Sequence, residues 1–168
     1  EIAGGNSSPY GALSAFGIDP MYISLTAVPD LQQLGNAEVL GSDGAAKLDA
    51  LRTAAGVDYD AVRALKRRAL IAGLKRFHRD ELANREPGPR GREFQAFTQQ
   101  HRAWLADYAL YRAIKDECQG KPWWEWPAPL RDREAAALTA ASARLGDEVL
   151  YFKRSEEHTS ELQSRYVI

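Results

Sequence analysis

Apolar residues recur at three- and four-residue steps along three stretches of the chain, and this period predicts amphipathic helices. The first predicted helix begins after Asp58, a suitable N-cap residue, and ends near Asp80. The second runs from about Arg92 to Gln119, and the third opens after Arg131. The chain is therefore predicted to be mainly α.

Each predicted helix has its own kind of apolar side. The first carries Val62, Leu65, Ala69, Leu70, Ala72, Leu74 and Phe77. The second carries an aromatic stripe, namely Phe94, Phe97, His101, Trp104, Tyr108 and Tyr111. The third carries Leu138, Ala141, Leu145, Val149 and Phe152. We interpret the aromatic stripe as core, and a platform for sugar rings is the alternative.

The stretches between these helices are shorter and contain most of the Gly and Pro residues. Residues 21–25 are predicted to be extended, and residues 28–34 to form one or two helical turns that Asp30 caps or favours. Residues 35–44 have the composition of a loop, and a short helix over 45–54 should follow. Two Pro and two Gly within residues 84–91 predict a break before the second long helix.

Composition and charge exclude several classes of function. The 168 residues are 45% hydrophobic and carry a net charge of −1, so no general attraction to nucleic acid or to an anionic membrane is indicated. No apolar run approaches the roughly 18 residues of a membrane span. The single Cys118 excludes an internal disulfide and favours a reducing, cytoplasmic location. The chain begins with Glu1, and we expect it to be a piece of a longer protein.

Motifs for common chemistries are missing from the sequence. It has no Gly-rich phosphate loop, no CxxC pair and no HExxH, and Cys118 has no base near it in sequence. The basic run Arg67–Arg79 invites a nucleic-acid interpretation, but in a nearly neutral chain a solvated helix face is favoured. His78 within that run is interpreted as an exposed residue rather than a metal ligand.

The segment Ser7–Leu25, which reads SSPYGALSAFGIDPMYISL, is a poor helix former. Its two prolines remove amide donors, and Gly11 and Gly17 add backbone freedom. A loop this rich in aromatic and hydroxyl side chains is more typical of a binding surface than of a spacer.

This segment resembles the pattern SPYxxxSAFxxxPxxIxL near the start of the 4-alpha-glucanotransferases of glycoside hydrolase family 77. Further resemblances follow in the family's order: VDYxxVxxxK from Val57, WLxDYALF from Trp104, WxxWP from Trp123 and LRxRE from Leu130. Trp123, Trp124 and Trp126 lie in a proline-rich loop, and we expect them to pin that loop to the core. Asp107, beside the aromatic stripe, is expected to make a structural hydrogen bond.

The resemblance implies a (β/α)8 TIM barrel in the full-length family, with a helical insertion. On that basis residues 1–27 form a loop and short strand at the sugar-site edge, and residues 28–153 form the helical insertion subdomain. The family transfers α-1,4-glucan segments between maltooligosaccharides by a retaining mechanism, on glucans derived from starch or glycogen. No metal or organic cofactor is implied. The catalytic carboxylates are expected beyond residue 153, so the chain alone should be inactive.

The same resemblance implies which residues bind substrate. Tyr10 is the tyrosine of the SPY motif, which lines the subsite of the transferred sugar ring. Ser8 and Ser14 are close enough in sequence to hydrogen-bond the ligand or to brace Tyr10, and bracing is favoured for Ser14.

The end of the chain departs from the family. Residues 154–164 (RSEEHTSELQS) resemble the translation of a sequencing adapter, so residues 154–168 are expected to be an artefactual tail that is disordered or loosely helical, with little buried area. Its acidic and histidine side chains, namely Glu156, Glu157, His158 and Glu161, are accordingly not interpreted as a metal cluster.

Two other classes of function stay open at this point. One is a non-catalytic helical module that binds carbohydrate or another partner through Tyr10 and the Trp loop. The other is a nucleic-acid module that works through residues 63–79.

Overall fold

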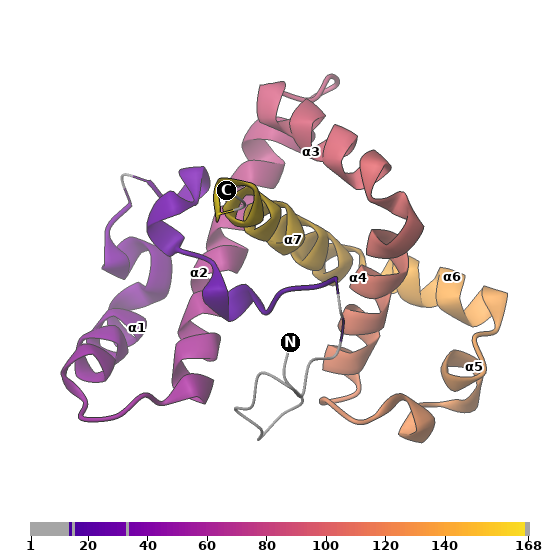
Figure 1. Cartoon of the computed structure of the whole chain (residues 1–168), viewed down its shortest axis with the longest axis horizontal. Coiled ribbons are helices and arrows are strands. Elements are labelled where there is room, and N and C mark those ends of the chain that lie inside the picture. The colour runs from indigo at the N-terminus through magenta and orange to yellow at the C-terminus, as the bar shows by residue number, and fades with distance from the viewer. Residues whose placement is uncertain (1–13, 15, 33, 167–168) are drawn as a thin grey trace. The chain divides into compact units, whose positions relative to one another are not determined.

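The computed structural model describes residues 14, 16–32 and 34–166, and every regular element in that part of the chain is helical (Figure 1). The prediction of a mainly α chain is therefore confirmed for these residues. The α-helices are α1 Asn36–Thr53, α2 Tyr59–Phe77, α3 Pro89–Gln100, α4 Arg102–Glu117, α5 Ala128–Arg131, α6 Ala135–Arg144 and α7 Gly146–Tyr166. Shorter 3-10 turns occupy Pro20–Tyr22, Leu25–Ala27, Pro29–Leu31 and Trp123–Glu125, and a π-helical turn occupies His78–Leu82.

The chain divides into two compact units, which are described here one at a time. Unit 1 holds residues 95–156 and the described part of the first 18 residues, and unit 2 holds residues 19–94 and the described residues after 156. The boundaries fall within α3 and α7. The division into residues 1–27 and 28–153 that the family resemblance implies stays a prediction.

Helix α2 is the centre of unit 2. The Asp58 carboxylate accepts a hydrogen bond of 2.9 Å from the Ala61 amide, so the predicted N-cap is confirmed. The predicted apolar stripe is largely right. Its buried members are Leu65, Ala69, Leu70 and Phe77, while Val62, Ala72 and Leu74 are half-buried.

The stretch before α1 forms 3-10 turns against α2, and the extended conformation predicted for residues 21–25 is wrong. The Asp19 carboxylate accepts from the Met21 amide at 2.9 Å and caps a turn that starts at Pro20. Asp19 also pairs with Arg63 of α2 at 3.3 Å. Lys66 of α2 donates to the carbonyl oxygens of Met21 and, at 2.9 Å, of Ile23. These contacts with α2 hold the backbone in turns.

Helix α1 lies beside α2 (Figure 1). It includes residues 36–44, which the sequence predicts to be a loop. Gly41 has φ 72° and ψ 169°, so two helical segments meet there at a kink. The left-handed φ favours glycine, and the glycines of this stretch mark a bend rather than a loop. Asp43 pairs with Arg68 of α2 at 2.7 Å, just after the kink.

A buried carboxylate anchors the third 3-10 turn. Asp30 accepts from Arg90 at 2.7 Å, and Arg90 also pairs with Glu81 at 3.0 Å. The Arg90 guanidinium lies 5.6 Å from the centre of the Phe77 ring, which meets Phe94 edge-on. Asp30 therefore lies in the first turn of the element, as predicted, but Val28 is the N-cap residue.

Two of the predicted long helices are interrupted in unit 1. The second breaks at His101 (φ −96°, ψ 11°) into α3 and α4, and the third breaks at Leu145 (φ −102°, ψ 28°) into α6 and α7. The third stripe is otherwise right, since Ala141, Val149 and Phe152 are buried with Leu145.

The aromatic stripe is not the core that the sequence indicates. The buried side of α4 carries Leu105, Ala109, Ala113 and Ile114, while the stripe residues from Phe97 to Tyr111 are half-buried. In the stripe, only Phe94 is buried among the described residues. The buried side of α4 therefore carries small and aliphatic side chains, and the rings of the stripe beyond Phe94 are only partly covered.

The expectation of a loosely packed tail is wrong for residues 154–160. Helix α7 runs without a break through Val149 and Arg154, and Arg154, Ser155, Glu156, Glu157 and Thr159 are buried. No Pro or Gly follows Gly146, so nothing in the backbone stops a helix once it has begun. The side chains of Leu162, Tyr166 and Ile168 lie outside the described residues, and the foreign origin of the segment stays a prediction.

Candidate functional site

The described end of the SPY loop is held by hydrogen bonds within the loop and by one ring that packs on α4. The Ser14 hydroxyl accepts hydrogen bonds of 3.0 Å from the amides of Phe16 and Gly17. Phe16 stacks on Trp104 with ring centres 5.8 Å apart. The Ser14 hydroxyl therefore braces the loop backbone at residues 16 and 17. The sequence favours the bracing of Tyr10, which lies outside the described residues, so that role of Ser14 stays a prediction. Its binding to a sugar stays a prediction.

Two further contacts fix the loop where it leaves unit 1. The backbone of Gly17 lies so close to Tyr108 that a Cβ atom at residue 17 would overlap the Tyr108 ring. The Ile18 amide donates to the Glu156 carboxylate at 3.2 Å. Ser8 and Tyr10, the other predicted site residues, lie outside the described residues.

A sharp turn at the end of α4 lies beside a hollow in unit 1. Gln119 and Gly120 have φ values of 56° and 78°, and the Gly120 amide donates to the Lys115 carbonyl at 2.8 Å. The Lys115 ammonium donates back to the Gly120 carbonyl at 2.9 Å. This helix-ending turn reverses the chain, so that the Trp loop lies back along α4.

The three tryptophans of this loop have different environments. Trp126 is buried (7% exposed), its indole N–H donates to the Lys121 carbonyl at 3.0 Å, and its ring lies 5.3 Å from that of Tyr111. Trp123 and Trp124 are 50% and 60% exposed. Only Trp126 therefore pins the loop as predicted. The other two rings meet each other edge-on and are largely exposed to solvent.

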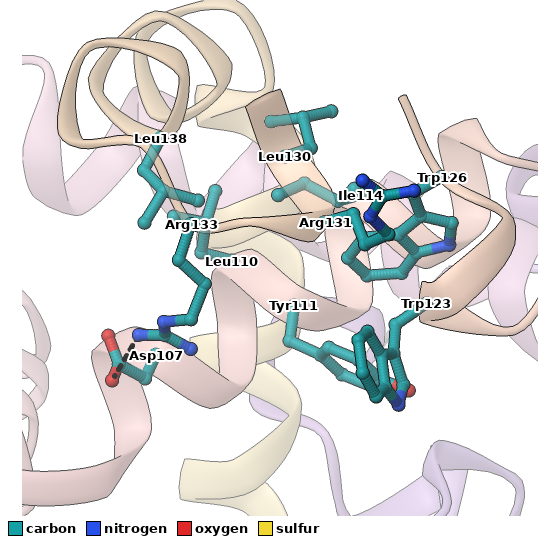
Figure 2. Close-up of a pocket in the computed structure, with 10 residues that line it drawn as sticks. All are labelled: Asp107, Leu110, Tyr111, Ile114, Trp123, Trp126, Leu130, Arg131, Arg133 and Leu138. Atoms are coloured by element: carbon teal, nitrogen blue, oxygen red, sulfur yellow. Dashed lines mark hydrogen bonds and ion pairs between the residues drawn. The ribbon is translucent and has the colours of Figure 1, made fainter. Parts of the chain in front are cut away.

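The hollow has a volume of about 330 Å³ and lies between α4, the Trp loop, α5 and α6 (Figure 2). Figure 2 shows the rings of Tyr111, Trp123 and Trp126 gathered on one side, with Arg133 reaching Asp107 on the other. The lining residues are Asp107, Leu110, Tyr111, Ile114, Trp123, Trp126, Leu130, Arg131, Arg133 and Leu138.

The rim of this hollow carries paired charges. Arg133 donates to Asp107 at 3.3 Å, which gives Asp107 the hydrogen bond predicted for it. Arg131 donates to Asp132 at 2.8 Å, and this lowers the pKa of the Asp132 carboxyl. Arg133 also has φ 58°, an uncommon backbone conformation for a residue with a Cβ. The rim therefore offers donors and acceptors without an excess of one charge.

Two titratable groups of unit 1 keep their ordinary charge at neutral pH. Burial lowers the pKa of Arg112 to about 10, so its guanidinium stays protonated, 4.6 Å from the centre of the Phe152 ring. Burial, with the neighbouring Glu117 carboxylate, raises the pKa of Cys118. A thiol with a raised pKa is a poor nucleophile, which agrees with the sequence interpretation.

The basic run on α2 does not form a row of unpaired cations. Arg68 pairs with Asp43, and Arg76 and Arg79 both pair with Asp80. His78 is exposed, as predicted. In the part of the chain that the structure describes, no three His, Cys, Asp or Glu side chains could hold a metal ion. Among the described helices, none combines the length and apolar character that a membrane span requires.

Comparison with known proteins identifies the family. The family model for 4-alpha-glucanotransferase matches residues 2–161, which includes the start of the segment predicted to be foreign. A 4-alpha-glucanotransferase from Thermus thermophilus is 35% identical over 150 residues, which are 88% of this chain and 26% of the relative. One from Synechocystis is 36% identical over 149 residues, 88% of this chain and 27% of the relative.

The Aquifex aeolicus relative is 40% identical over 80 residues, which are 48% of this chain and 14% of that protein. The chain thus spans about a quarter of the length of the first two relatives. The motifs recognised in the sequence and the match from residue 2 to residue 161 agree. The chain belongs to the 4-alpha-glucanotransferase family.

Proposed function

We propose that this chain is part of an enzyme that transfers α-1,4-glucan segments between maltooligosaccharides by a retaining mechanism. The observation that carries the proposal is the family match over residues 2–161, which includes the whole SPY loop. The substrate is a maltooligosaccharide or a glucan derived from starch or glycogen. A cytoplasmic location stays a prediction that rests on the single cysteine.

The chain supplies part of the binding surface in this proposal, and other parts of the protein supply the reacting groups. A retaining transfer uses two carboxylates about 5 Å apart, one as nucleophile and one as acid and base. We assign them to strands of a (β/α)8 barrel beyond residue 153. The chain alone is therefore inactive, and its helices wall the glucan groove.

Tyr10 is the residue of this chain that we assign to the transferred sugar. A tyrosine ring covers the apolar face of a sugar, and its hydroxyl hydrogen-bonds a sugar oxygen. The described end of the same loop supports such a role, because Ser14 braces its backbone, and Phe16 and Gly17 pack against α4. A loop that is held in place loses less entropy when it binds a ligand.

Substitution of Tyr10 tests this assignment in a full-length relative that carries the same SPYGALSAF loop. Tyr10→Phe removes one hydrogen bond, worth about 0.5–1.5 kcal/mol, and should lower kcat/KM roughly a few-fold to tenfold. Tyr10→Ala also removes the ring contact and should lower kcat/KM distinctly further. Both variants should keep the melting temperature of the parent.

A tyrosine that only packs the loop gives a different pattern. Tyr10→Phe would then transfer glucan as well as the parent does, and Tyr10→Ala would lose stability in step with activity. That pair of results would remove Tyr10 from the sugar site.

A further inference from the structure

We propose that the hollow beside Trp123 is a glucan-binding site, in which the rings of Trp123 and Tyr111 cover sugar rings. The choice of an α-glucan as the ligand rests on the proposed function. The site itself is argued from the walls of the hollow, all of which belong to unit 1.

The aromatic wall is the first argument. Trp123 keeps half of its surface exposed, although it lies in a loop that buries Trp126. The axial C–H groups of a glucose ring form an apolar patch that an aromatic face can cover, while an indole N–H or a phenol can hydrogen-bond the hydroxyls. Tyr111, half-buried against Trp126, adds a second ring to the same hollow.

The charged rim is the second argument, because it distinguishes a neutral sugar from an anion. Arg131 and Arg133 each pair with a carboxylate, Asp132 and Asp107. A phosphate would have to compete with those carboxylates, whereas sugar hydroxyls can donate to the carboxylates and accept from the guanidinium groups. The rim thus suits a polyhydroxylated, uncharged ligand.

The third argument is that the hollow is already formed. The Trp126 indole is tied to the Lys121 carbonyl, Pro122 and Pro127 restrict the loop, and Arg133 holds a left-handed conformation at the rim. Little ordering is then required when a ligand binds. Its volume of about 330 Å³ is at the lower end of ligand pockets, about 300–1,000 Å³, and suits a short segment of a glucan.

Calorimetric titration of the 168-residue chain with maltoheptaose tests the site. Trp123→Ala should weaken binding about tenfold or more, as truncation of an aromatic anchor often does. Trp124→Ala is the matched control, because Trp124 has similar exposure and does not line the hollow, although its ring meets that of Trp123 edge-on at 5.9 Å. It should bind like the parent. Circular dichroism should show equal helix content in all three proteins.

Three results would overturn the proposal: no maltoheptaose binding by the folded parent, equal losses in the two variants, or a Trp123-dependent dimer without glucan binding in sedimentation. The failure of this site would leave the proposed function untouched. The titration measures binding at Trp123, whereas the Tyr10 experiment measures transfer. Conversely, if Tyr10 substitutions left kcat/KM unchanged, Trp123→Ala should still bind maltoheptaose more weakly than Trp124→Ala.

Discussion

Residue 17 has no room for a side chain, which explains why a glycine stands there. The Tyr108 ring occupies the space that a Cβ atom at residue 17 would fill. We predict that Gly17→Ala lowers the free energy of unfolding by about 1–3 kcal/mol, because the added methyl forces the loop and the ring apart. Urea denaturation followed by circular dichroism measures this change.

Gly35→Ala is the control for that substitution. Gly35 has nothing within 4 Å of its added Cβ and an ordinary φ of −74°. Its added methyl meets no atom, so the loss of unfolding free energy should be only the small cost of replacing an N-cap glycine of α1, below about 1 kcal/mol. A Gly17→Ala protein as stable as the Gly35→Ala protein would show that the loop does not lie against Tyr108.

At the residue scale, the sequence indicates the type of contact better than the partner. It predicts a hydrogen bond for Asp107, which is found with Arg133. It also predicts that Ser14 braces Tyr10, whereas the partners that the structure describes for Ser14 are the Phe16 and Gly17 amides. It does not distinguish Trp126 from Trp123, because the difference depends on where the chain reverses. The left-handed residues Gln119 and Gly120 set that reversal, and a left-handed Gln has no clear sequence signal.

At the scale of elements, Lys66 connects the 3-10 turns to α2. Its ammonium donates to the Met21 and Ile23 carbonyls, and burial lowers its pKa. We predict that Lys66→Met lowers the free energy of unfolding by about 1–3 kcal/mol, because two carbonyl oxygens lose their donor. Chemical denaturation of the variant measures the loss.

Lys75→Met provides the comparison on the same helix, since Lys75 is exposed. It should leave the unfolding midpoint nearly unchanged. If both variants unfold at the midpoint of the parent, the hydrogen bonds from Lys66 to the two carbonyls do not contribute to stability.

The start of α2 could be predicted, whereas the breaks within the other two long helices could not. Asp58 has a side chain that caps α2 directly, so the local sequence contains the signal. The break at His101 occurs at a residue that is not a helix breaker, within an unbroken apolar period. The break at Leu145 is directly followed by Gly146, but the apolar period continues across it and hides that signal. Gly41 gives the opposite error, because the composition around it indicates a loop where the helix only bends.

At the scale of the whole molecule, α7 shows that a segment that departs from the family's sequence pattern can still continue a helix and be buried. Residues 154–160 continue the helix although they are mostly polar, and four of them with a charged or hydroxyl side chain are less than 8% exposed: Arg154, Ser155, Glu156 and Thr159. The Glu156 carboxylate also accepts a hydrogen bond from the Ile18 amide. Composition alone therefore did not predict whether this segment packs.

The motifs indicate the family because they lie in the family's order along most of the chain, and the match over residues 2–161 agrees with them. Mainly helical structure follows from the apolar periods. The reacting carboxylates do not follow from either source, because the chain spans about a quarter of its first two relatives.

Glucose release from maltotriose tests the central claim that this chain is the binding part of a 4-alpha-glucanotransferase. We would compare the 168-residue chain with a chimera in which its matched segment replaces that of the Thermus thermophilus relative. The chain alone should release no glucose above a buffer control. The chimera should release glucose, and its Tyr10→Ala variant should release less. Release by the chain alone, or a folded chimera that transfers nothing, would contradict the account.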